Sequence, residues 1–61
     1  MNMMNLKAKE VNTGGGSMVT IITCDQWDYI IVMSDEAVGI YTDEDAFWDG
    51  SDPINSTFIN A

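Results

Sequence analysis

Carboxylates are the side chains through which this chain could do chemistry. Acid pairs can work as general acid and base, as they do in glycosidases. A domain of 61 residues has no cleft that would hold a sugar chain between two such groups, so we expect no enzymatic activity. Nine carboxylates fall within the 28 residues from Asp25 to Asp52: Asp25, Asp28, Asp35, Glu36, Asp43, Glu44, Asp45, Asp49 and Asp52.

Other catalytic and metal-binding groups are scarce. The chain has no histidine and no arginine, and Cys24 is its one cysteine, without an activating neighbour. Zinc therefore has no plausible ligand set, and we expect no cofactor. A calcium loop of the EF-hand type starting at Asp43 would place Phe47 and Trp48 where an oxygen ligand and a glycine are needed. Weak association with divalent ions stays open, but a dedicated metal site is not expected.

The net charge of −8 points to a basic partner. Lys7 and Lys9 are the only cations, so the chain cannot neutralise many phosphates and should not bind nucleic acid directly. A rigid array of carboxylates could instead occupy a basic groove that tracks a nucleic-acid backbone. Trp48 either packs in the core or its rim, or is an apolar anchor at an interface. We predict that the partner-binding residues are the nine carboxylates above together with Trp48.

Apolar runs rich in Ile, Val and Tyr predict the strands that position these residues. We expect strands over Leu6–Val11, Met18–Cys24, Trp27–Ser34 and Ala37–Tyr41. For the first of these, a helical turn is the alternative, since Leu, Lys, Ala and Glu favour helices. The glycine triplet in Asn12–Ser17 predicts a hairpin loop, and Ser34, Asp35 and Glu36 predict another.

A short helix is predicted from Asp43 to Asp49. Thr42 is expected to cap it, the acids suit the positive end of its dipole, and Gly50 should end it. Phe47 is expected to anchor this helix onto the sheet. The predicted fold is α+β, a small antiparallel β-sheet of three to four strands with one short C-terminal helix.

The chain should form one domain, 1–61, with residues 1–5 and 55–61 frayed. Ile54, Phe58 and Ile59 could nevertheless add an edge strand. The central strands are apolar on both faces, and one short helix cannot cover both. An exposed apolar face favours contact with a second copy or another protein.

No membrane or secretory segment is expected. Met1–Leu6 is too short for a signal peptide, and no apolar run reaches membrane-spanning length. The single thiol fits a reducing compartment, so we expect the protein in the cytoplasm.

In size, acidity and β-rich pattern, the chain resembles small acidic inhibitors made by bacteriophages, such as anti-CRISPR proteins and uracil-DNA glycosylase inhibitors. The resemblance implies a nucleic-acid mimic in the host cell cytoplasm that binds and blocks a nucleic-acid enzyme or effector complex. The alternative is a homodimeric structural or assembly module whose acidic surface keeps it soluble.

Overall fold

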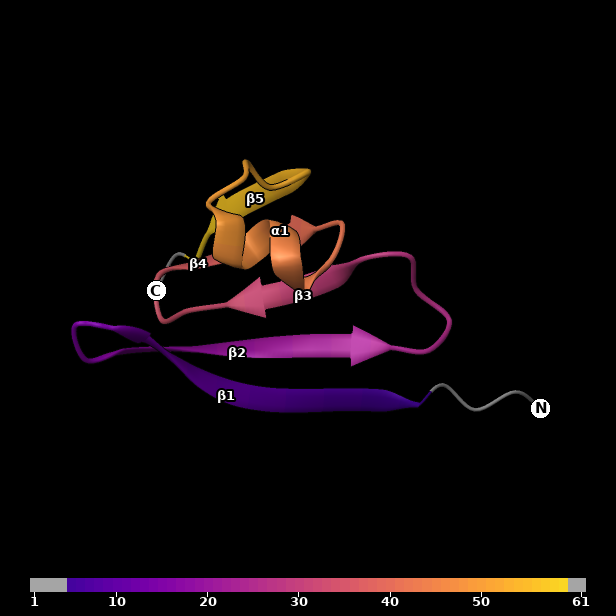
Figure 1. Ribbon diagram of the computed structural model, residues 1–61, viewed down its shortest axis with the longest axis horizontal. Coiled ribbons are helices and arrows are strands. Elements are labelled where there is room, and N and C mark those ends of the chain that lie inside the picture. Colours follow the sequence, from indigo (N-terminus) through magenta and orange to yellow (C-terminus); the bar gives the residue numbers. More distant parts are fainter. Residues whose placement is uncertain (1–4, 60–61) are drawn as a thin grey trace.

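The computed structural model describes residues 5–59, which form one antiparallel sheet and one short helix (Figure 1). The strands follow each other in the sheet in chain order, β1-β2-β3-β4-β5. The helix lies between β4 and β5 in the chain and packs over one face of the sheet (Figure 1). The elements are β1 (Leu6–Gly14), β2 (Ser17–Cys24), β3 (Ile30–Met33), β4 (Ala37–Tyr41), α1 (Glu44–Asp49) and β5 (Asn55–Phe58).

The α+β class is confirmed, but the sheet has five strands rather than three to four. The additional strand, β5, lies in the tail 55–61, so the expected fraying of residues 55–58 is wrong and the alternative of an added edge strand is confirmed. It pairs with β4, and the Ile59 N–H donates to the Glu36 carbonyl at 2.7 Å just beyond it. Pairing satisfies the backbone groups that β4 would otherwise present at an open edge. The predicted fraying of residues 1–4, 60 and 61 lies outside the described residues.

The β1–β2 hairpin is longer than expected because β1 continues past Val11 to Gly14. The helical alternative for this segment is wrong. Gly14, Gly15 and Gly16 all have positive φ, at 98°, 63° and 84°, which explains why the turn uses glycine. The Gly14 N–H also donates to Asn12 Oδ1 at 2.7 Å. The predicted hairpin loop is therefore confirmed.

The third strand is shorter than expected and begins at Ile30. Trp27 and Tyr29 precede it in the β2–β3 connection, where their rings stack with centroids 5.1 Å apart. The predicted loop after β3 is confirmed. Ser34 organises it, since its Oγ accepts from the N–H groups of Glu36 and Ala37 at 3.2 and 3.1 Å.

The helix starts at Glu44, and Asp43 caps it in place of Thr42. Asp43 has extended backbone, and its Oδ1 accepts from the Ala46 N–H at 2.8 Å. An aspartate caps at least as well as a threonine, so the cap falls one residue later than predicted. Gly50 ends the helix as expected, with a left-handed φ of 82°.

Strand pairing assigns the side chains to two faces. One cross-strand row contains Lys9, Ile21, Val32, Gly39 and Ser56. This row belongs to the covered face, the one against which α1 packs. The next row contains Ala8, Ile22, Ile31, Ile40 and Asn55. It belongs to the opposite face, which we call the open face.

The core lies under the helix. Ile21, Ile30 and Val32 are buried there, and Phe47 from α1 packs against them. The Phe47 ring also meets Tyr41 edge-on, with centroids 5.4 Å apart. The predicted anchoring role of Phe47 is confirmed. Gly39 leaves room for Tyr41, because a Cβ on Gly39 would lie 3.1 Å from that ring.

Candidate interaction surfaces

The ten predicted partner-binding residues lie in three parts of the fold. Asp25 and Asp28 are in the β2–β3 connection. Because Ile30 pairs with Tyr41, this connection is at the same end of the sheet as the start of the helix. Asp35 and Glu36 are in the β3–β4 loop at the opposite end. The helix and its flanks carry the remaining residues: Asp43, Glu44, Asp45, Trp48, Asp49 and Asp52.

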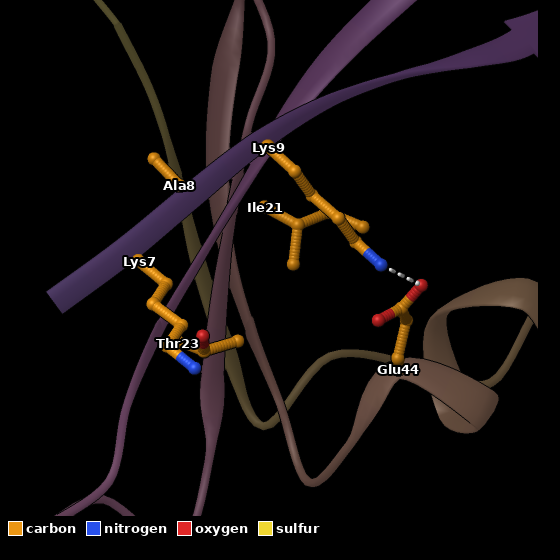
Figure 2. Close-up of a pocket in the computed structure, with 6 residues that line it drawn as sticks. All are labelled: Lys7, Ala8, Lys9, Ile21, Thr23 and Glu44. Carbon is orange, nitrogen blue, oxygen red and sulfur yellow. Dashed lines mark ion pairs between the residues drawn. The ribbon is translucent and has the colours of Figure 1, made fainter.

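Glu44 is paired within the chain. Its Oε2 lies 3.0 Å from Lys9 Nζ, so the ion pair joins α1 to β1 (Figure 2). The same oxygen accepts from Trp48 Nε1 at 3.3 Å. The hydrogen bond from Lys9 and then that from Trp48 hold the pKa of Glu44 below its ordinary value. Glu44 is ionised, but the positive charge of Lys9 beside it offsets its negative charge, so it offers less to a basic partner than its sequence position suggested. Lys9 was missed because nothing in the sequence shows that β1 passes beside the helix.

Two other carboxylates are also engaged. Asp43 caps the helix, as described above. Asp25 accepts from Asn5 Nδ2 at 3.0 Å, and the Cys24 thiol lies 3.8 Å from its other oxygen. Both groups have structural roles that a charge-display argument does not predict.

The carboxylates of Asp45, Asp49 and Asp52 differ from these. All three residues are exposed. Within residues 5–59 they form no side-chain hydrogen bond and no ion pair. We call them the helix-side carboxylates. They are the acids on and just after α1 that are directly available to a partner.

Trp48 lies beside them and is about half exposed, at 49%. Its ring contacts Phe47 edge-on at 5.0 Å, and its Nε1 is bonded to Glu44. The side chain is thus at the rim of the core with one side in solvent. Holding an aromatic ring in this way reduces the entropy it would lose on binding.

A hollow of about 520 Å³ separates α1 from β1. Lys7, Lys9 and Glu44 line it together with Ile21 and Thr23 (Figure 2). Both cations of the chain are therefore on the covered face, at the β1 edge. None of the helix-side carboxylates is among the residues that line this hollow.

The open face is apolar, as the strand patterns predicted. Ile22, Ile31 and Ile40 are direct neighbours across β2, β3 and β4. Around them, Leu6, Met18 and Met33 are 57%, 50% and 36% exposed. Glu10 is the one charged residue at a strand position of this face. The sequence predicted an apolar face, but it did not predict that the charges would be excluded from it.

Comparison of the chain with protein families, curated proteins and solved structures gives no match. Among residues 5–59, no three ligand-type side chains come together in a way that could hold a metal ion. In the same part of the chain, no helix has the length and apolar character needed to cross a membrane.

Proposed function

We propose that the protein is a non-enzymatic inhibitor of the nucleic-acid-mimic type. Its helix-side carboxylates would bind a basic nucleic-acid-binding surface on a host enzyme or effector complex, in the host cytoplasm. The observation that carries the proposal is the position of Asp45, Asp49 and Asp52. They are exposed and free of internal partners within residues 5–59, and Trp48 lies beside them.

Electrostatics supports this assignment. Carboxylates held close together repel one another and destabilise a compact chain, so their concentration has a cost that mixed charges would avoid. A basic groove would offset that repulsion and speed the encounter between the two proteins. Aspartate side chains are short and lose little conformational entropy when they become fixed.

The way in which the helix is held also supports the proposed binding role of the helix-side carboxylates. The helix is capped by Asp43, tied to β1 by the ion pair of Glu44, and anchored by Phe47. The helix-side carboxylates are thus held at a defined spacing before a partner arrives, which reduces the entropic cost of binding. Trp48 would supply apolar contact area of the kind that binding hot spots use. Asp25 and Asp28 would extend the surface at the same end of the sheet.

The test compares two variants that each lose three negative charges. The first replaces the helix-side carboxylates, as Asp45→Asn, Asp49→Asn and Asp52→Asn. The control removes three exposed acids elsewhere, as Glu10→Gln, Asp35→Asn and Glu36→Gln. Although the sequence predicted Asp35 and Glu36 as partner-binding residues, they lie in the loop at the other end of the sheet and are outside the proposed surface. Asp43 and Glu44 are kept in both, because one caps the helix and the other bonds Lys9.

Each protein is used to capture partners from a bacterial lysate at low salt and at about 1 M salt, where screening is nearly complete. Mass spectrometry identifies the retained proteins, and a DNA duplex is added to compete with them. We expect the parent and the control to retain nucleic-acid-binding proteins that are released by salt and by the duplex, and the helix-side variant to lose them. Equal capture by the helix-side variant, or capture indifferent to salt, would contradict the proposal.

A further inference from the structure

The open face has a continuous apolar centre. Strand pairing places Ile22, Ile31 and Ile40 side by side, with Ala8 at the β1 end of their row. The adjacent row adds Met33 next to Val38. Since α1 packs on the covered face, these side chains are shielded mainly by each other. Such a surface is larger and more contiguous than the scattered apolar residues of an ordinary monomer.

Charge indicates which partner suits this face. The chain carries −8 overall, yet Glu10 is the one charged residue at the strand positions of the open face. The other carboxylates lie in the connections, the loops and α1, and both lysines are on the covered face. A basic protein would therefore find almost nothing to bind here. A second copy could bring its own open face against this one and keep the carboxylates of both chains at the rim.

We propose that the open faces of two copies pack against each other to form a two-fold symmetric homodimer. Self-complementary faces of this kind are typical of two-fold dimers. Five strands at about 4.8 Å spacing make the face about 24 Å wide, and about six residues per strand make it about 20 Å long. Each copy would then contribute about 500 Å², so that both together approach the roughly 1,000 Å² that a specific interface needs.

The small core of the single chain is a second reason to expect a dimer. Among the described residues, the buried apolar set consists of Ile21, Cys24, Ile30 and Val32. A chain of this length is marginally stable by itself and commonly needs a partner chain. Pairing would bury the row of Ile22, Ile31 and Ile40 and enlarge the core without a disulfide or a metal. This dimer does not depend on the proposed inhibitory function.

The experiment measures molar mass by light scattering after size-exclusion chromatography, over a range of protein concentrations. Ile31→Lys places a charge in the middle of the open face, and Met33→Lys places one at a more exposed position of the same face, where folding is less at risk. Ser51→Lys adds the same charge in the connection after α1 and is the matched control.

We expect the parent and Ser51→Lys to be dimers and both open-face variants to dimerise at least about tenfold more weakly, because an unpaired charge would be buried. Circular dichroism checks that each variant folds. For the parent, the thermal midpoint should rise with protein concentration, a measurement that needs no variant. A parent that stays monomeric at all concentrations with an unchanged midpoint, or folded open-face variants that dimerise like Ser51→Lys, would overturn the proposal.

Discussion

The covered face and the open face of the sheet have similar strand residues but different surroundings. On the covered face, Ile21 is 1% exposed because α1 and the Phe47 ring pack over it. On the open face, Ile22 is the next residue in the chain and is only half buried. The comparison shows that one short helix covers one face of this sheet and leaves the other face partly exposed.

The distribution of charge follows the same division. The covered face receives both lysines, and one of them pairs with Glu44. The open face excludes charge except at Glu10. In the proposed homodimer this separation would place the apolar open face at the interface, and in the proposed inhibitor it would leave other carboxylates to a basic partner.

The largest expected effect is a difference in stability loss between alanine substitutions at two neighbouring isoleucines, Ile21 and Ile22. Ile21→Ala removes side-chain atoms from the covered core and should lower the free energy of unfolding by about 2–5 kcal/mol. Ile22→Ala on the open face should cost roughly 1 kcal/mol at protein concentrations where the monomer dominates, because less area is lost from a buried environment. Urea denaturation measures both. Equal losses in dilute solution would mean that the two faces are covered to the same extent.

The second prediction concerns the ring that covers the core. Phe47→Ala should lower the free energy of unfolding by about 2–3 kcal/mol, since it removes the contacts with Tyr41 and the buried isoleucines. Trp48→Ala should cost less than about 1 kcal/mol, because its ring is half exposed. Thermal unfolding followed by circular dichroism ranks the two. A larger loss of stability for Trp48→Ala than for Phe47→Ala would mean that Trp48, and not Phe47, anchors the helix.

The third prediction tests which residue caps the helix that covers the sheet. Asp43→Ala should cost about 1 kcal/mol, because the Ala46 N–H loses its acceptor. Thr42→Ala should change the free energy of unfolding by only about 0.3 kcal/mol, as for an ordinary surface site. Urea denaturation measures the free energy of unfolding of both variants. A larger loss for Thr42→Ala than for Asp43→Ala would contradict the assignment of Asp43 as the cap.

The smallest effect is the pH dependence of the contact between α1 and β1. The folded-state pKa of Glu44 is lowered, chiefly by Lys9, so this contact stabilises the protein above the ordinary carboxyl pKa of 4.5. Its contribution is lost as the pH falls from that value through the lower folded-state pKa. Glu44→Gln should remove this part of the pH dependence of stability between neutral and acidic pH. An unchanged dependence would show that the exposed ion pair contributes nothing measurable.

Much of the sheet could be predicted from the sequence, because the apolar runs of β2 and β4 and the glycine triplet are local signals. The bounds of Ala37–Tyr41 and the helix end at Gly50 agree with the prediction. The segment Asn55–Phe58 could not be assigned with the same ease. All of its residues are exposed, and its strand form depends on pairing with β4 rather than on an apolar pattern.

The candidate surface was predictable in composition but not in geometry. The sequence shows that carboxylates and Trp48 are close along the chain. It does not show that Glu44 would meet Lys9, that Asp43 would cap the helix, or that Asp35 would lie at the far end of the sheet. These outcomes depend on which strand passes beside the helix and on the direction of each hairpin. Such contacts are set by tertiary packing and not by local propensity.

The most direct test of the separation of charge from the open face is sedimentation equilibrium of the parent protein in a salt series. Each copy carries a net charge of −8, so two copies repel each other at low salt, whereas apolar contact is not weakened by screening. We predict a dimer whose dissociation constant falls as salt rises to about 1 M. A dimer that dissociates as salt rises, or a chain that is monomeric throughout the series, would contradict it.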